Sequence, residues 1–275
     1  MRGKLSAAGA VVLMLASCSP GNSQRSTPTL IERIRSDGQL LVAVPYEGRP
    51  PPGDVNPSLT TYQGFAVEVA REIASSLGVA LRFAPSAADA VAHLPARSDI
   101  HLSFPLRPLT ATLAKRSTLT DPYLTSFGTL MTRAARRLGS RPTLCSSEEP
   151  WRIALPARVL RSALSRPSLT ACLDLHYAGR VDAIAGPDVA LARIAVDECG
   201  RCVLSEQRLG RFFLSAVVPQ GEVEFADYVG GVVEEAYREG RWRSWYEEWI
   251  GRFARGDAAP GFVELDEALE EVTSS

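Results

Sequence analysis

Cysteine is the residue type whose number and spacing say most about the chemistry of this sequence. Five are present, and four of them lie in the second half of the chain: Cys145, Cys172, Cys199 and Cys202. An even number of cysteines in an oxidising compartment favours up to two disulfide bonds. Three pairings are possible, and the simplest joins Cys145 to Cys172 and Cys199 to Cys202. Free thiols and a redox-active Cys199–Cys202 pair are the alternatives. The redox interpretation is disfavoured because no strand directly precedes the pair and no apolar helix follows it.

The fifth cysteine, Cys18, closes an N-terminal segment with the pattern of an export signal. Arg2 and Lys4 precede residues 5–16, a run of apolar and small residues. About a dozen such residues cannot span roughly 30 Å of hydrocarbon as a helix, but they suit the core of a signal peptide. The run ends in Leu-Ala-Ser-Cys, which resembles the bacterial lipobox, in which the thiol accepts a diacylglycerol. We therefore expect residues 1–17 to be a lipoprotein signal peptide and Cys18 to be lipid-modified. An ordinary signal peptide or a weak anchor helix is the alternative.

Composition and charge exclude several classes of protein. Residues 18–28 are rich in Ser, Pro, Gly and Asn and suit a flexible tether. Removal of the signal peptide changes the net charge from −1 to −3, because two basic residues and no acidic residue are lost. No clustered positive excess remains, so no nucleic acid is expected as a partner. The three histidines, His93, His101 and His176, are far apart and none has ligand spacing to a cysteine. Neither a metal nor another cofactor is expected.

Apolar runs and amphipathic periods alternate along the first half of the mature chain. Strands are predicted at 40–44, 79–83, 100–104 and 125–132, with a helical turn at 30–34, a helix at 66–77 and a weak helix at 87–94. Gly78 directly follows the 66–77 helix and is typical of a C-terminal cap. Strand, helix and strand in this order predict right-handed crossovers and a largely parallel sheet.

A second, similar set of elements follows the basic connector 133–141. Strands are predicted at 153–155, 182–185 and 212–218, and helices at 157–164, 169–178, 187–196 and 222–239. A last helix closes at Gly251 and carries Trp242, Trp245 and Trp249. Tryptophans at this helical spacing indicate packing into a core rather than a ligand cage.

Five short motifs in this order resemble a known family. They are residues 30–44, 64–70, 120–123, 179–184 and 240–249, with the sequences LIERIRSDGQLLVAV, GFAVEVA, TDPY, GRVDAI and GRWRSWYEEW. Together they are similar to the extracytoplasmic solute-binding proteins of amino-acid ABC importers, bacterial solute-binding protein family 3. The resemblance spans residues 29–251.

This resemblance implies an α/β, two-lobed periplasmic-binding-protein fold. Each lobe is a mostly parallel sheet flanked by helices, two hinge strands join the lobes, and the ligand lies in the cleft between them. Mapped onto this chain, lobe 1 comprises 29–130 plus 216–255, and lobe 2 comprises 133–213. The crossings fall near 129–133 and 213–218, and 256–275 is an acidic C-terminal tail.

The resemblance also implies an arginine that binds the ligand's carboxylate, and here the sequence departs from the family. The expected position is occupied by Ala114, with Arg116 two residues away. Arg107 is the favoured candidate, because it lies just past the carboxyl end of a predicted parallel strand, where such clefts lie. Arg116 is the alternative, and Ser103, at the end of the same strand, is a further candidate contact.

Two more candidate contacts come from the resemblance. Tyr46 follows the first strand, where the family often has an aromatic wall for the ligand. The family's amine-binding acid falls on Pro187, so Asp188 is the candidate if the turn is shifted by one residue. A family turn with a hydroxyl residue is replaced by Leu-Pro-Ala at 155–157, which offers only backbone N–H groups.

The function expected from these observations is extracytoplasmic binding of a small polar solute, either an amino acid or a related carboxylate. The protein would deliver the solute to an ABC permease while lipid-anchored to a membrane, at the periplasmic face or the cell surface. One alternative is an accessory or sensor binding protein of a periplasmic quinoprotein dehydrogenase system. Another is a dehydratase-like enzyme on the same fold, which would need a protonatable carboxylate in the cleft. The sequence shows no distinctive acid pair or Ser/His/Asp set, which favours a binding protein.

Overall fold

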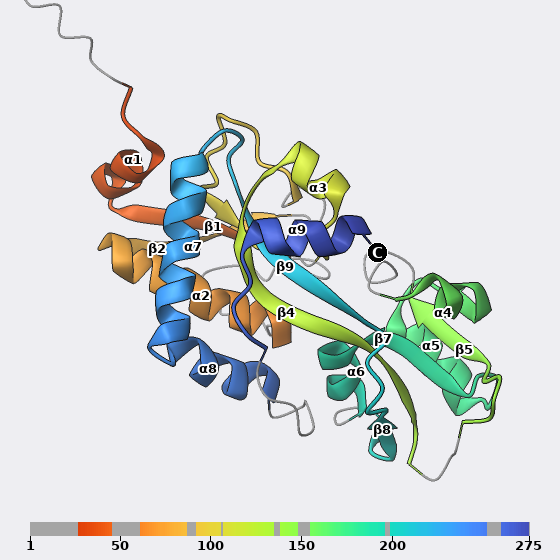
Figure 1. Ribbon diagram of the computed structural model, residues 1–275. Coiled ribbons are helices and arrows are strands. Elements are labelled where there is room, and N and C mark those ends of the chain that lie inside the picture. The colour runs from red at the N-terminus through yellow and green to blue at the C-terminus, as the bar shows by residue number, and fades with distance from the viewer. Residues whose placement is uncertain are drawn as a thin grey trace, which may run out of the picture.

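The computed structural model describes residues 27–45, 61–86, 92–105, 107–134, 138–147, 155–195, 199–251 and 260–274. Within them the chain forms two α/β lobes joined by two long strands (Figure 1). The predicted signal peptide, the predicted lipidation site Cys18 and the candidate contact Tyr46 lie outside the described residues.

The described strands form one curled, mixed sheet in the order β2-β1-β3-β9-β4-β7-β5-β6, with β8 paired to β4. Lobe 1 contains β1 (Gln39–Pro45), β2 (Ala80–Ser86) and β3 (Leu102–Ser103). Lobe 2 contains β5 (Leu144–Ser147), β6 (Ala163–Arg166), β7 (Ala183–Pro187) and β8 (Cys202–Leu204). β1 pairs in parallel with β2 and β3, and β5 pairs in parallel with β6 and β7. The predicted mostly parallel sheet in each lobe is confirmed.

Two antiparallel strands connect the lobes, β4 (Thr118–Arg133) and β9 (Gly210–Val218). They pair with each other from Thr118–Val218 to Gly128–Gly210. From Gly128 onward, β4 pairs with β7 and then with β8. We call the paired part of β4 and β9 the hinge ribbon.

Helices cover the sheet in both lobes. Lobe 1 carries α1 (Leu30–Asp37), α2 (Thr61–Leu77), α3 (Ala111–Arg116), α7 (Val223–Arg238), α8 (Arg241–Tyr246), a π-helical turn η4 (Glu247–Gly251) and α9 (Leu265–Ser274). Lobe 2 carries α4 (Ala157–Ser162), α5 (Leu169–Tyr177) and α6 (Asp188–Ile194). α1 shows why these boundaries form: Thr29 and Glu32 make a capping box, and Gly38 ends the helix with a φ of 67°.

Aromatic residues dominate the main core of lobe 1. Trp242 of α8 is fully buried and its ring stacks against Tyr237 and Tyr246, while Phe65 of α2 meets it edge-on. Its indole N–H donates a hydrogen bond to the carbonyl of Tyr123 at 2.9 Å. The partly buried Trp245 and Trp249 pack against the same core. The prediction that the tryptophans of the last helix pack into the core is confirmed.

Gly64 and Trp249 show why two of the sequence motifs occur together. Gly64 lies in the first turn of α2, and a Cβ atom there would overlap the indole ring of Trp249. Only glycine lets the start of α2 and the closing helical turn approach this closely.

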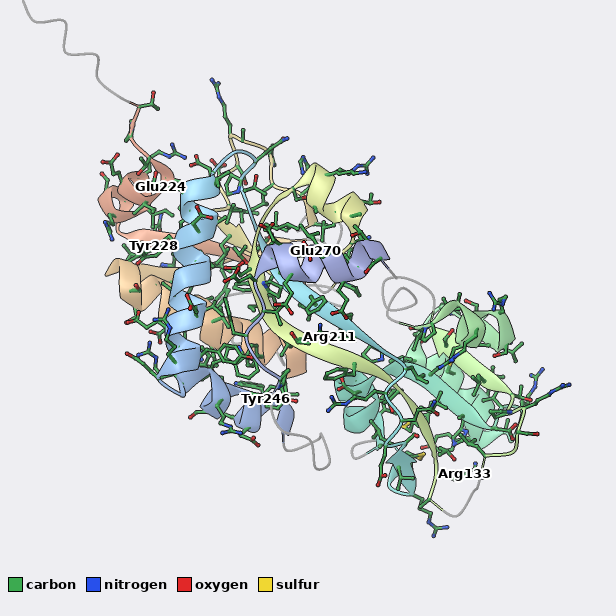
Figure 2. All side chains as sticks on the ribbon, in the orientation of Figure 1. Arg133, Arg211, Glu224, Tyr228, Tyr246 and Glu270 are labelled. Carbon is green, nitrogen blue, oxygen red and sulfur yellow. A yellow bond between two sulfur atoms is a disulfide. The ribbon has the colours of Figure 1, made fainter. Side chains whose placement is uncertain are left out.

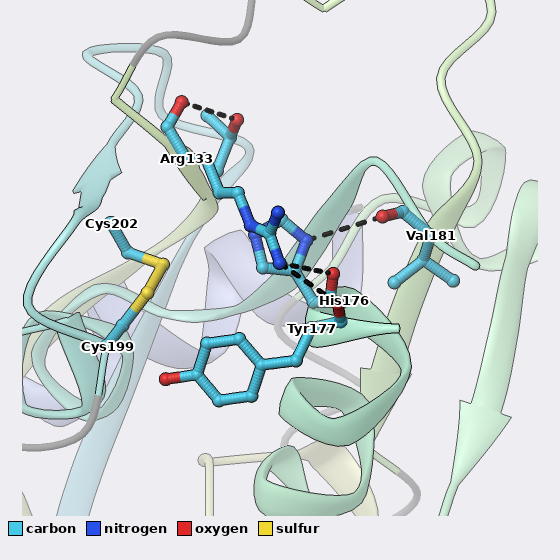
Figure 3. Close-up of a disulfide and its surroundings, with 7 residues drawn as sticks. Arg133, His176, Tyr177, Val181, Cys199 and Cys202 are labelled. Carbon is cyan, nitrogen blue, oxygen red and sulfur yellow. Dashed lines mark hydrogen bonds between the residues drawn. A yellow bond between two sulfur atoms is a disulfide. The ribbon is translucent and has the colours of Figure 1, made fainter. Parts of the chain in front are cut away.

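Two disulfide bonds lie in lobe 2, and they have the simplest pairing expected from the sequence. Cys145 of β5 is bonded to Cys172 of α5, and Cys199 is bonded to Cys202 at the start of β8. Beside the second bond, the guanidinium of Arg133 donates to the carbonyls of His176 and Tyr177 at 3.3 and 3.0 Å (Figure 3). These carbonyls belong to the last turn of α5, so Arg133 satisfies backbone acceptors at that helix end.

The structure differs from the sequence prediction at several element boundaries, and α2 begins at Thr61 rather than at residue 66. The first described strand of lobe 2 is β5, at 144–147, which the sequence did not predict, whereas residues 153 and 154 of the strand predicted at 153–155 lie outside the described residues. The serines of β5 are buried, so its composition hides its position. The helix predicted at 157–164 ends at Ser162, and 163–166 form β6. The strand predicted at 125–132 begins seven residues earlier, at Thr118.

Candidate functional site

The topology brings the carboxyl ends of the parallel strands of both lobes toward each other. β3 is antiparallel to β9 and parallel to β1, so β1 and β3 both run toward lobe 2. β7 is antiparallel to β4 and parallel to β5, so β5 and β7 run toward lobe 1. In α/β proteins, ligands bind beyond the carboxyl ends of such strands. We call the residues that follow β1, β3, β5 and β7 the strand-end region.

Asp188 lies in the strand-end region of lobe 2, as the first residue of α6 directly after β7. Its carboxylate accepts a hydrogen bond from the hydroxyl of Ser126, a buried residue of the hinge ribbon. Two residues further along α6, Ala190 packs against the main core of lobe 1. Asp188 therefore lies where lobe 2 meets both lobe 1 and the hinge.

Arg107 lies in the strand-end region of lobe 1 and is exposed. Two residues later, the N–H of Leu109 donates to the carbonyl of Phe213 on β9 at 2.8 Å. Phe213 pairs with Thr125 of β4, the residue next to Ser126. The segment with Arg107 therefore borders β9 at about the level where Asp188 borders β4, so the two residues flank the hinge ribbon from opposite edges.

Arg116 has a different location. It is the last residue of α3 and is exposed, two residues before Thr118. Thr118 pairs with Val218, at the end of the ribbon that is remote from lobe 2. The β9 partners of Thr118 and Ser126 are Val218 and Phe212, which are six residues apart, about 20 Å at the usual rise per residue. The structure thus brings Arg107, and not Arg116, to the level of Asp188.

Ser103 is fully buried on β3, opposite Ala43 of β1 and Val217 of β9. Its hydroxyl donates to the carbonyl of Val217 over 3.5 Å, a long hydrogen bond. A ligand that used this hydroxyl would have to compete with that bond. The remaining candidate, Tyr46, would follow Pro45, the last residue of β1.

Sequence reasoning missed Ser126, the partner of Asp188. Thr120 and Thr129 are further buried polar residues of β4, so little in the sequence singled out the adjacent Thr125 and Ser126. Both are buried, at 5% and 2% exposure. Buried polar side chains need hydrogen-bond partners, which marks such positions as candidates for a structural or binding role.

The described part of the chain offers neither a cluster of metal ligands nor a membrane-spanning helix. Those residues contain no group of three or more His, Cys, Asp and Glu side chains that could hold a metal ion. Across the same ranges, every helix is too short or too polar to traverse a bilayer.

The chain belongs to the bacterial extracellular solute-binding proteins, family 3, whose family model matches residues 42–252. None of the curated proteins matches the chain in sequence. The assignment therefore rests on the family match, which covers well over half of the chain.

Solved structures share the fold at low sequence identity. An ancestral cationic amino acid solute-binding protein superposes with a TM-score of 0.65 at 18% identity, covering 80% of this chain and 99% of that one. The substrate-binding protein of an amino acid ABC transporter superposes with a TM-score of 0.56 at 16% identity, covering 78% of this chain and 100% of that one. An ancestral cyclohexadienyl dehydratase superposes with a TM-score of 0.54 at 18% identity, covering 82% of this chain and 98% of that one. At these identities the likeness shows the fold alone, and that fold is shared by binding proteins and an enzyme.

Proposed function

We propose that this protein binds a small polar solute, an amino acid or a related carboxylate, between its lobes and delivers it to an ABC importer. The observation that carries the proposal is the placement of Arg107 and Asp188. They come from different lobes, follow the carboxyl ends of parallel strands, and flank the hinge ribbon at one level. The amino-acid-binding proteins among the similar structures support this solute class.

The two residues offer complementary chemistry to such a solute. The planar guanidinium of Arg107 matches a carboxylate with two parallel hydrogen bonds. The carboxylate of Asp188, oriented by Ser126, would accept from an ammonium group. A solute that contacts both lobes at once stabilises the closed state by the difference in its affinity for the two states.

The proposed location is extracytoplasmic, with the protein anchored to a membrane, at the periplasmic face or the cell surface, by a lipid on Cys18. The family is extracellular, and the N-terminal sequence has the expected lipobox. Replacing Cys18→Ser should move the protein from the membrane fraction to the soluble fraction or block its processing. Unchanged fractionation together with an unchanged mature N-terminus would contradict the anchor.

The binding proposal is tested by a thermal-shift screen of amino acids and carboxylates, followed by calorimetry. Arg107→Ala should weaken the best ligand about 10- to 100-fold, because one charge-assisted contact is worth roughly 1.5–3 kcal/mol. Arg107→Lys should rescue little, since a point charge cannot reproduce the bidentate geometry. Asp188→Asn should weaken amine-bearing ligands more than simple carboxylates.

Arg116→Ala is the matched control, because it removes an exposed arginine on the same connection between β3 and β4. Its affinity should equal that of the unmodified protein. Loss of binding in Arg116→Ala alone would show that the wrong arginine was chosen. A screen in which no amino acid or carboxylate raises the melting temperature would overturn the proposed solute class.

A dehydratase-like activity is the second candidate, because one similar structure is an ancestral dehydratase. Such chemistry needs a carboxyl group that is protonated near neutral pH. Burial raises the pKa of Asp121, but this residue lies near the start of β4 and hydrogen-bonds to α9, away from the strand-end region. Recovery of the bound ligand chemically unchanged after long incubation would favour binding over catalysis.

A further inference from the structure

The C-terminal helix α9 lies outside the part of the chain that matches the family. The match ends at residue 252, whereas α9 spans Leu265–Ser274. In Figure 1, α9 crosses β4 and β9 between lobe 1 and the start of lobe 2. Its contacts show what it does to the hinge ribbon.

The first turn of α9 is fixed to β4. The backbone N–H of Leu265 donates to Asp121 Oδ1 at 2.8 Å. α7 packs closely against the carboxylate of Asp121, since a Cβ atom at Gly230 would come within 2.5 Å of Asp121 Oδ2. This end of α9 is therefore attached to the lobe-1 end of the ribbon.

The last turns of α9 are attached to β9. Glu271 accepts two hydrogen bonds from the guanidinium of Arg211, one of them from Nε at 3.0 Å. This pairing raises the pKa of Arg211 above its ordinary value. Arg211 pairs with Phe127 on β4, next to the point where the ribbon reaches lobe 2. Figure 2 shows Arg211 beneath α9 and the neighbouring Glu270 on the helix.

Apolar contacts fill the space between these two attachments. Ala268, Leu265, Leu269 and Val272 of α9 cluster with Phe213 and Val217 of β9 and Leu119 of β4. The alternate residues of β9, including Phe212 and Leu214, belong to the main core of lobe 1. The ribbon is therefore packed on both faces, and α9 supplies the packing on one of them.

The attachments end one residue before an unusual strand pair. Gly128 of β4 lies opposite Gly210 of β9, and β4 begins to pair with β7 at the same residue. Neither glycine has a positive φ, so the backbone conformation does not require glycine here. What the two glycines share is the lack of a side chain, which weakens a strand and lowers the resistance of its dihedral angles to change.

We propose that α9 is a splint that keeps the lobe-1 part of the hinge ribbon rigid, and that the lobes pivot at the Gly128–Gly210 pair. The splint confines bending to the point where a few dihedral angles can absorb it. The pivot lies at residue 210 on β9, earlier than the crossing at 213–218 suggested by the sequence. The proposal rests on the proposed function in one respect: this pivot would open and close the ligand site.

The test compares two neighbouring glutamates of α9 in the ligand-free, full-length protein. Nitroxide labels on Ser75→Cys of α2 and Thr170→Cys of α5, both exposed positions, report the distance between the lobes. Glu271→Gln should broaden the distance distribution, because the ribbon can then bend over residues 119–127 as well. Glu270→Gln, which removes the adjacent exposed charge, should leave the distribution unchanged.

Amide hydrogen exchange supplies a readout that a change in overall stability would not reproduce. In Glu271→Gln, exchange should accelerate about two- to fivefold in residues 211–217, as expected for loss of a partly exposed ion pair, and remain unchanged in β1. Gly210→Ala should narrow the distance distribution, because it adds a side chain at the pivot. Equal distributions for Glu271→Gln and the unmodified protein, or faster exchange throughout lobe 1, would overturn the splint.

These measurements need no ligand, so they are independent of the solute proposal. A broadened distribution in a protein that binds no amino acid or carboxylate would keep the splint and reject the solute class. If the protein binds an amino acid or carboxylate but Glu271→Gln has no effect on the distance distribution, the solute class is kept and the splint is rejected.

Discussion

The two lobes share a strand–helix–strand architecture but are stabilised by different means. The main core of lobe 1 contains large buried aromatic side chains, among them Trp242, Tyr123, Phe65 and Phe225. The two core clusters of lobe 2 consist, within the described residues, of aliphatic side chains, methionine and cysteine. A small core buries too little apolar surface to be secure by itself, and covalent crosslinks are the usual compensation in exported proteins. Both disulfide bonds lie in lobe 2.

The largest effect is expected from truncating the aromatic core of lobe 1. Trp242→Ala should lower the free energy of unfolding by about 3–5 kcal/mol, because it removes a fully buried ring and leaves a cavity. It also leaves the carbonyl of Tyr123 without the indole donor. Urea unfolding, followed by the hydrogen exchange of peptides from each lobe, measures the loss and locates it.

Trp245→Ala is the matched control, three residues along the same helix and only partly buried. Its effect should be clearly smaller. If the two variants lose equal stability, the core of lobe 1 does not depend on the buried ring, and the contrast between the lobes fails.

The next largest effect is expected from the disulfide that joins β5 to α5 in lobe 2. Its cysteines are 27 residues apart, so the loop-entropy relation gives a stabilisation of about 3.5 kcal/mol. The double variant Cys145→Ala with Cys172→Ala should lose about this amount. Hydrogen exchange should accelerate mainly in β5, β7 and α5, and least in β1.

The second disulfide provides the comparison within the same lobe. Cys199 and Cys202 are three residues apart, so the same relation gives only about 1.9 kcal/mol. Replacing both by alanine should therefore cost about half as much as replacing the first pair. The reverse order would mean that loop closure does not explain how the disulfides stabilise lobe 2.

The lobes also differ in how far their structure was predictable from sequence. In lobe 1, amphipathic periods and caps predicted the helices now seen as α1, α2 and α7, because each buries one apolar stripe. In lobe 2, β5 was missed because Ser146 and Ser147 are buried polar residues, and a hydrophobicity pattern does not mark them. In β5 the side chains are small and Cys145 is joined to α5 by a disulfide bond, so the hydrophobic periodicity of the sequence says less about the position of the strand.

The candidate site was predictable only in part, for a related reason. The order of the motifs located the strand ends, and therefore the candidates Arg107 and Asp188. The hydrogen bond between Ser126 and Asp188 was not predictable, because it joins residues 62 positions apart in the sequence. The position of α9 likewise depends on contacts between distant residues, such as Arg211 and Glu271. Sequence periodicity reports which face of an element is buried, but it does not identify the partner.

The smallest effect is expected in the acid response of lobe 1, where the partly buried His101 titrates. His101 precedes β3, and its Nδ1 accepts a hydrogen bond from the N–H of Leu41 at 3.1 Å. Burial lowers the pKa of His101, Arg33 lowers it further, and Asp37 and Asp99 act in the opposite direction. Protonation at Nδ1 would remove the acceptor that Leu41 uses.

The sign of the pH dependence follows from this lowered pKa. The unfolded chain takes up a proton on His101 near pH 6.5, its ordinary pKa, whereas the folded protein does so only at lower pH. The stabilising contribution is therefore present above about pH 6.5 and is lost as the pH falls below it. His101→Asn places an oxygen that does not titrate where Nδ1 accepts, so Tm should fall less between pH 7.5 and 5.5 than in the unmodified protein. His93 is exposed, so His93→Asn is the control and should leave the slope of Tm against pH unchanged. An unchanged slope of Tm against pH in His101→Asn would show that the acid sensitivity of the protein arises elsewhere.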